Sequence, residues 1–223
     1  YTITRHFPSL VAELSAPTPA TYVSLFKAIL QRQADTVGKW TRLGFVHGAL
    51  NTDNTLISGE TVDYGPCAFM ERYRGDAKFS SIDTYGRYKF ENQPMILGWN
   101  MARLVETLLP LLGATPDEGM TAAQEALGEF DDLCEQAIRK EFATALGLDE
   151  SDTGTVEQFR ELLYLHNPDI TTLLRALTDN TAPPSGFEAF VHDWKTQDPD
   201  IEAMRAVNPL FIPRNHLVEA ALA

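Results

Sequence analysis

The spacing of hydrophobic residues along the chain predicts a mainly helical protein. Between residues 21 and 42 the apolar positions recur every three or four residues, which is the spacing of one helix face. Thr21 is expected to cap this helix and Gly44 to end it. The preceding residues 1–20 are interrupted by prolines and predict an irregular lead-in.

The same spacing predicts further helices in the second half of the chain. One begins at Pro94 and buries a stripe that includes Leu97 and Met101, and another runs from Thr121 to Leu146. Shorter helices are expected near 155–165, 169–178 and 186–197, and one more near the end of the chain.

A different pattern stands between the first two long helices. Residues 55–63 have β-branched and apolar residues on both sides of Ser58-Gly59-Glu60, which predicts a small hairpin. Residues 67–93 show little periodicity and predict a long ordered loop, a kind of segment that is often functional. The predicted fold class is therefore mainly α with a small β-hairpin, and helices must cover the hairpin because it would be marginal alone.

Composition narrows the classes of function. With 223 residues, 44% hydrophobic and 22% charged, the chain can form one domain with a real core, here taken as 1–223. The net charge of -13 argues against nonspecific binding to nucleic acid or to an anionic membrane. No apolar run is expected to reach the roughly 20 residues that a bilayer-spanning helix needs. Cys67 and Cys134 fit neither a disulfide framework nor a metal motif and are expected to be reduced core thiols.

The most informative stretch is residues 45–66. A kinase catalytic loop reads H-x-D-x-x-x-x-N and is followed by a hairpin and a D-F-G-like turn. With His47 as the loop histidine, Asn54 falls on the metal-binding asparagine and Asp63 on the aspartate of the turn. The position of the catalytic aspartate is Ala49, which cannot accept a proton.

These residue types suit the chemistry of a nucleoside triphosphate such as ATP. Mg²⁺ must neutralise the phosphate charge, and an amide oxygen and a carboxylate are suitable ligands for it. Asn54 and Asp63 are therefore the candidate metal and cofactor-binding residues. Asp53, directly before Asn54, could act as the catalytic base from a shifted place, while His47 more plausibly holds the loop than transfers a proton.

The same residues carry a resemblance to a known family. The segments 47–54 (HGALNTDN) and 62–66 (VDYGP) together resemble the signature of selenoprotein O. The resemblance continues through 86–94 (GRYKFENQP) and Trp99-Asn100, and reappears at 208–215 (NPLFIPRN).

This resemblance implies a protein-kinase-like fold, with ATP bound in a flipped orientation and AMP transferred to Ser, Thr or Tyr hydroxyls of proteins. By position it implies Asp53 as the base, and Asn54 and Asp63 as ligands of Mg²⁺ or Mn²⁺. We then expect a kinase-like C-lobe with additional helices, a catalytic loop at 45–66 and a helical remainder at 94–223. The N-lobe would be absent, so that the chain is an internal fragment of a longer protein and inactive alone. For a bacterial protein the expected location is the cytoplasm, whereas eukaryotic relatives of the family are mitochondrial.

Two other functions remain open at this point. A small-molecule phosphotransferase of the aminoglycoside- or choline-kinase type shares H-G-D-x-x-x-x-N, but Ala49 replaces the aspartate that those enzymes keep. A non-catalytic pseudokinase module that binds nucleotides or partners needs no metal clamp, and the presence of Asn54 and Asp63 argues against it. Product analysis would separate the three.

Several other residues have less distinctive expectations. Trp40, Trp99 and Trp194 are expected to be core or packing residues rather than nucleotide stackers. Arg87 is expected either to pair with an acidic neighbour on the surface or to help shape the cleft.

Overall fold

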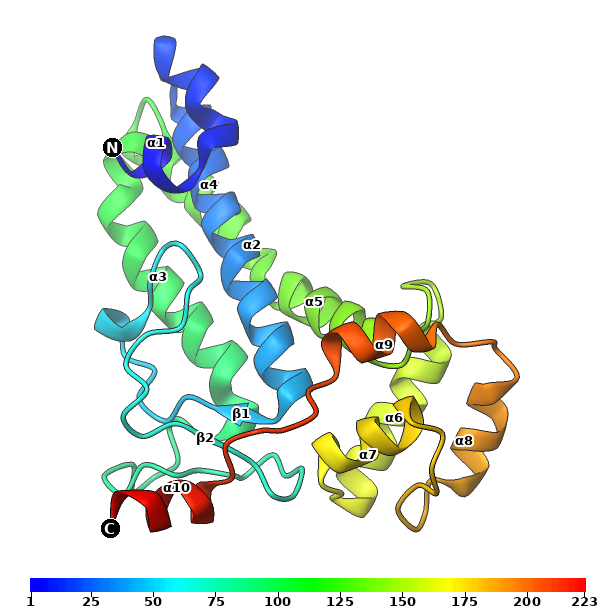
Figure 1. Ribbon diagram of the computed structural model, residues 1–223. Helices are drawn as coiled ribbons and strands as arrows, with labels where there is room; N and C mark the ends of the chain where they lie inside the picture. The colour runs from blue at the N-terminus through cyan, green and yellow to red at the C-terminus, as the bar shows by residue number, and fades with distance from the viewer.

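The computed structural model describes residues 1–223, and helices make up most of it (Figure 1). The helices are α1 (Thr2–His6), α2 (Pro19–Leu43), α3 (Gln93–Leu112), α4 (Pro116–Gly128), α5 (Phe130–Ala145), α6 (Thr153–His166), α7 (Ile170–Thr178), α8 (Glu188–Lys195), α9 (Ile201–Val207) and α10 (Asn215–Leu222). Short 3₁₀ turns occupy Pro8–Ser15, Thr52–Asn54 and Phe90–Asn92. The prediction of a mainly helical chain is confirmed.

Helix α2 is the central element of the first half of the chain. It packs against α3 and α5, and its buried face includes Phe26, Leu30 and Val37. The helix begins earlier than predicted, because Thr18 rather than Thr21 is the N-cap, and Thr21 completes a capping box with it. Gly44 ends it in the left-handed conformation with φ 64°, as glycine allows without strain.

The predicted single helix from Thr121 to Leu146 is wrong. Two helices, α4 and α5, meet at Glu129, where the backbone N–H bonds to the carbonyls of Ala126 and Leu127 instead of continuing the α-helical pattern. Gly128, a weak helix former, precedes this break. Helix α4 has its own start signal, a capping box between Thr115 and Glu118.

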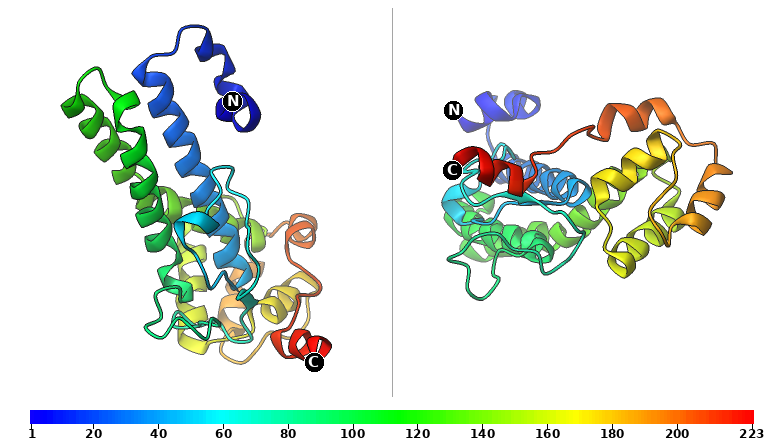
Figure 2. Two further views of the ribbon diagram at one scale, coloured as in Figure 1. Left: turned by 90° about the vertical axis from the view of Figure 1, so that its left-hand side faces the viewer. Right: turned by 60° about the horizontal axis from the view of Figure 1, so that its bottom comes forward.

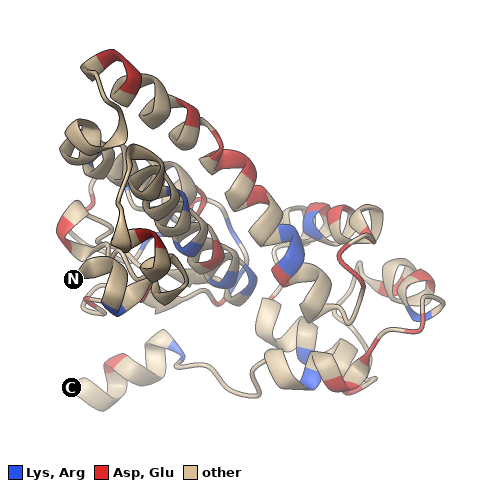
Figure 3. Ribbon diagram, turned by 90° about the horizontal axis from the view of Figure 1, so that it is seen from above, with Lys and Arg blue, Asp and Glu red and all other residues tan.

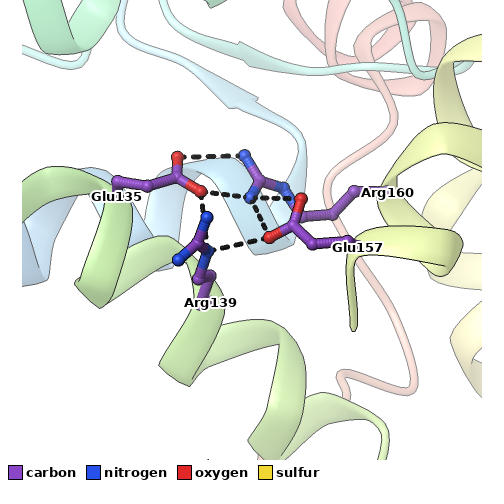
Figure 4. A network of polar contacts seen from close by, with 4 residues as sticks. All are labelled: Glu135, Arg139, Glu157 and Arg160. Carbon is purple, nitrogen blue, oxygen red and sulfur yellow. Dashed lines mark hydrogen bonds and ion pairs between the residues drawn. The ribbon is translucent and has the colours of Figure 1, made fainter. Parts of the chain in front are cut away.

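Helices α6 to α9 form a second group beside the long helices (Figures 1 and 2). Phe142 of α5 and Phe159 of α6 pack edge to face, with ring centroids 5.9 Å apart, and join the group to the long helix α5. A four-residue charge network also links α5 to α6 (Figure 4). In it Glu135 and Arg139 of α5 bond with Glu157 and Arg160 of α6, and Arg139 Nε lies 2.8 Å from Glu157 Oε1. Helix α9 was not predicted.

The end of the chain contacts both the segment after β2 and the start of α7. Arg214 bonds to Glu71 at 2.9 Å and to Asp169 at 2.7 Å, and α10 follows directly. Figure 1 shows α10 lying beside the irregular loops around β2 rather than with α6 to α9. At the other end of the chain, the predicted irregular lead-in contains helix α1 and a 3₁₀ turn.

The small sheet differs from the predicted hairpin. Two-residue strands β1 (Phe45–Val46) and β2 (Ala68–Phe69) pair antiparallel, with Phe45 opposite Phe69. Within the predicted hairpin the pairing is reduced to one bridge, between Thr55 and Thr61, and Gly59 makes the turn with φ 79°. The turn at Gly59 was predicted correctly. The regular strand pairing, however, lies at the ends of segment 45–69 and not within residues 55–63.

Segment Phe90–Leu112, which includes α3, is long and apolar enough to cross a membrane by length and composition alone. No such run was expected from the sequence. This is weak evidence for a membrane span, because a core helix passes the same test. Here α3 packs against α2, α4 and α5 and buries residues such as Leu97, Met101 and Val105.

Charged residues occur along both groups of helices (Figure 3). Acidic residues outnumber basic ones, 31 to 18. A place where several cations gather is therefore unusual for this chain.

The two thiols provide a test of the packing. Cys134 is buried, and burial raises the pKa of its thiol to about 12. Burial also raises the pKa of Cys67, but this thiol is only half-buried and is not the core residue expected. We predict that a disulfide reagent at mildly alkaline pH modifies Cys67 in the folded chain but leaves Cys134 unmodified, since the thiolate is the reactive form.

Cys67→Ser should then remove the reaction of the folded chain, and denaturant should restore one reactive thiol. Rapid modification of Cys134 without denaturant would contradict the packing of α5.

Candidate active site

The candidate site lies on the loop of residues 45–66, and contacts between the two ends of this loop hold it in place. The chain leaves α2 at Gly44, forms β1, and reaches His47 directly. Pairing of β1 with β2 brings residues 45–46 and 68–69 together, so that the segment between them forms a closed loop on the protein. Gly48 has φ 84°, and a Cβ there would lie 2.6 Å from the carbonyl oxygen of Pro66. Only glycine fits this crossing of the two ends.

Two buried amide side chains of α3 form hydrogen bonds to residues of the loop. Gln93 donates from Nε2 to the carbonyl of Phe45 at 3.1 Å and accepts at Oε1 from the N–H of His47 at 2.8 Å. Asn100 donates from Nδ2 to the carbonyl of Leu50 at 3.2 Å and to Thr55 Oγ1 at 2.8 Å. Both side chains are almost fully buried. These bonds fix the loop on both sides of the candidate residues.

His47 lies inside the loop and is 1% exposed. Its Nδ1 accepts from the N–H of Ala49 at 3.3 Å, so the proton is on Nε2, which donates to the carbonyl of Val62 at 2.7 Å. Burial lowers the pKa of His47 from its ordinary value. A neutral imidazole thus bridges the start of the loop and the residue before Asp63, which fits the expected structural role.

Asn54 and Asp63 meet across the loop. Asn54 Nδ2 donates to Asp63 Oδ2 at 2.9 Å and to the carbonyl of Ala49 at 2.8 Å. These two bonds orient the amide, and they leave Oδ1 of Asn54 without a hydrogen-bond partner. Asp63 has φ 60°, an uncommon conformation for a residue other than glycine, and its side chain is exposed.

Asp53 lies in the same 3₁₀ turn as Asn54, spanning Thr52–Asn54. Its carboxylate is exposed and makes no hydrogen bond or ion pair with the rest of the chain. The structure thus places all three predicted site residues on one exposed loop, with Asn54 and Asp63 in direct contact and Asp53 adjacent in sequence. Asp53 is accessible to a partner from solution.

The donor set suits a hard cation. No group of three or more His, Cys, Asp or Glu side chains could hold a metal ion by itself. Asn54 Oδ1 and the Asp63 carboxylate offer two oxygen ligands, and Mg²⁺ is commonly bound through one or two carboxylates together with substrate phosphates. The residues therefore fit an ion that a nucleotide helps to bind, rather than a closed structural metal site.

Sequence reasoning missed the two α3 amides. Their signal was present, since Gln93 and Asn100 are seven residues apart and interrupt a buried apolar face. Of the three tryptophans expected to be core or packing residues, Trp40 and Trp194 are buried, whereas Trp99 is 46% exposed and packs against Arg87 and Arg103. Asn51, another loop residue, accepts a hydrogen bond from Tyr88, which was also not anticipated.

The buried histidine predicts a pH dependence of stability. The pKa of His47 is lower in the folded chain than in the unfolded chain, so below the ordinary value of about 6.5 the unfolded chain binds more protons. The contribution of His47 is therefore complete above that pH and is lost as the pH falls toward the folded-state pKa. We predict that His47→Gln reduces the change in unfolding free energy between about pH 7.5 and pH 5, by at most about 1.4 kcal/mol per pH unit.

The measurement is urea unfolding across that pH range. His192→Gln, on an exposed face of α8, is the matched control and should leave the pH profile unchanged. An unchanged profile in His47→Gln would mean that His47 is not held neutral by the fold.

Comparisons with known proteins give the following matches. A family described as protein adenylyltransferase SelO matches residues 1–185. A protein nucleotidyltransferase YdiU of Corynebacterium glutamicum (strain R) is 99% identical over 223 residues, covering 100% of this chain and 47% of that relative. YdiU proteins of Corynebacterium efficiens and of Mycobacterium sp. (strain KMS) are 55% and 44% identical, and all of this chain matches 46% and 48% of them. The chain spans about half the length of the curated relatives it matches.

Proposed function

Because the chain belongs to the SelO family, we propose that the protein containing it transfers AMP from ATP to hydroxyl groups of other proteins. The observation that supports this most is the 2.9 Å hydrogen bond from Asn54 Nδ2 to Asp63 Oδ2, which brings the two candidate ligand side chains together on the loop. Asp53 lies next to this pair. The relatives' names describe nucleotidyl transfer, and the choice of AMP and of Ser, Thr or Tyr acceptors is part of the proposal.

The proposed fold is the C-lobe of a protein-kinase-like structure with additional helices. The order of a buried loop histidine, an asparagine and an aspartate after a turn supports it. His47 and the α3 amides hold the loop, and Asn54 and Asp63 face the substrate side.

In the proposed reaction an acceptor hydroxyl attacks the α-phosphorus of ATP. Asp53 accepts the proton of the hydroxyl, the new bond forms between its oxygen and phosphorus, and the bond to the β-phosphate oxygen breaks to release pyrophosphate. Asn54 and Asp63 would hold Mg²⁺ or Mn²⁺, which supplies charge stabilisation at the reacting phosphate when bound. The bonds from Asn54 Nδ2 to the Ala49 carbonyl and to Asp63 hold the amide of Asn54 in place.

The first test removes carboxylates one at a time in the longer Corynebacterium glutamicum relative. Asp63→Ala should abolish AMP transfer to an acceptor protein, and Asp53→Ala should reduce it about 10²–10⁴-fold if Asp53 is a general base. The measurement is mass spectrometry of the acceptor after incubation with ATP and metal ion.

Asp132→Ala is the matched control, because Asp132 is an exposed carboxylate of α5 without an ion pair. Full activity in Asp53→Ala would remove the base from the mechanism and leave the metal ligands standing. Full activity in Asp63→Ala would refute the site.

The second test asks which phosphate is transferred. Ala49 stands where kinases have their catalytic aspartate, and its backbone already bonds to His47 and Asn54. We predict that Ala49→Asp does not create efficient γ-phosphoryl transfer, because the proposed orientation of ATP presents the α-phosphorus to the acceptor.

Acceptor proteins are incubated with α- or γ-labelled ATP. Label from the α position together with pyrophosphate release supports AMP transfer. Label only from the γ position would indicate a kinase, phosphorylation of a small molecule would indicate a phosphotransferase, and no transfer with nucleotide binding would indicate a pseudokinase module.

A further inference from the structure

An exposed tryptophan next to the candidate site is flanked by two arginines. Trp99 of α3 is 46% exposed, and the guanidinium carbons of Arg87 and Arg103 lie 5.1 Å and 5.3 Å from the centre of its ring. We refer to Arg87, Trp99 and Arg103 as the Trp–Arg platform. Such contacts attract a cation to the face of the ring and hold the guanidinium in place.

The platform borders the loop that holds Asp53. Trp99 and Arg103 line a pocket of about 440 Å³ together with Thr52, the residue directly before Asp53. Apolar side chains of Ile57, Met101 and Leu104 line the same pocket. Tyr88, the neighbour of Arg87, donates a hydrogen bond to Asn51 of the loop.

A separate pocket adjoins the residues that follow Asp63. It has a volume of about 430 Å³, is lined by Tyr64 to Phe69 and by residues of α10, and shares no residue with the first. The turn that holds Asp63 thus adjoins one pocket, and the turn that holds Asp53 adjoins the other.

The charge of the platform is available to a partner. Arg87 makes no ion pair, and its guanidinium lies against the rings of Trp99 and Tyr88. Arg103 pairs with Glu106, but both side chains are about half exposed, and such pairs add little net stability. In a chain of net charge -13, two cations around one aromatic ring are an exception.

From these observations we propose that the Trp–Arg platform and its pocket bind an acidic segment of the acceptor protein, next to the hydroxyl that is modified. This proposal rests on the proposed function and specifies its substrate class. An Asp or Glu of the segment bonds to Arg87 and Arg103, since guanidinium groups match carboxylates in geometry. An apolar side chain of the segment occupies the pocket beside Ile57 and Leu104.

The position of the pocket sets the spacing within the segment. Because Thr52 lines the pocket and Asp53 follows it, the acidic residue is expected within about four residues of the hydroxyl in an extended chain. Tryptophan and arginine are also the residue types that most often dominate binding energy at protein interfaces.

The test uses labelled peptides that contain one serine, one leucine and a variable flanking pair of Glu, Gln or Lys. Fluorescence anisotropy measures their binding to the 223-residue chain and to the longer Corynebacterium glutamicum relative. The Glu peptide should bind at least about tenfold more tightly than the Gln peptide, and Arg87→Glu with Arg103→Glu should reverse the order in favour of the Lys peptide.

Two variants serve as controls. Arg205→Glu changes the charge of an exposed arginine on α9 by the same amount and should keep the preference for Glu. Arg87→Lys should retain part of the preference, and circular dichroism checks that each variant is folded. Equal binding of the Glu and Gln peptides, or an equal loss in Arg205→Glu, would overturn the proposal.

AMP transfer to the same peptides gives the second readout in the longer relative. The charge reversals should change KM for the peptide and leave KM for ATP unchanged. A changed KM for ATP with an unchanged peptide preference would assign the arginines to the nucleotide and overturn the proposal. If no AMP is transferred to any acceptor but the preference for Glu persists, the platform stands and the proposed function fails.

Discussion

The candidate site depends on the hydrogen bonds by which α3 holds the loop. Gln93 and Asn100 present amides from a buried, apolar helix face to four backbone or side-chain groups of residues 45–55. In such surroundings an unpaired polar group is costly, so the loop has few alternative conformations. His47 extends this hold to Val62, and Asn54 can then reach Asp63. The exposed site residues therefore need no burial of their own to be fixed.

The long helices could be predicted from the sequence because their stability comes from a periodic apolar face. Helix α2 and its end at Gly44 show this most clearly. The break between α4 and α5 could not be predicted in the same way. The apolar periodicity continues across Glu129, whereas the α-helical hydrogen bonding of the backbone is interrupted there. The hairpin failed for another reason: strand pairing at β1 and β2 joins residues more than twenty apart, and local propensity carries no information about such contacts.

At the candidate site, the sequence supplied the residue types and their order, and the structure supplies the contacts. Asn54 and Asp63 were expected near each other, and they are hydrogen-bonded. The free oxygen of Asn54 could not be inferred, because it follows from the bond between its Nδ2 and the Ala49 carbonyl. The exposure of Trp99 could not be inferred from the sequence, because its ring packs against Arg87, which lies in the segment before α3.

The central claim is that Asn54 and Asp63 together bind the metal ion of a metal–nucleotide substrate. Anomalous diffraction from crystals grown with Mn²⁺ and a non-hydrolysable ATP analogue tests it most directly. The account predicts a metal peak about 2.0–2.6 Å from Asn54 Oδ1 and from a carboxylate oxygen of Asp63, with phosphate oxygens completing the coordination. A metal bound to the nucleotide but away from both side chains, or Asp63 turned into the helical core, would contradict it.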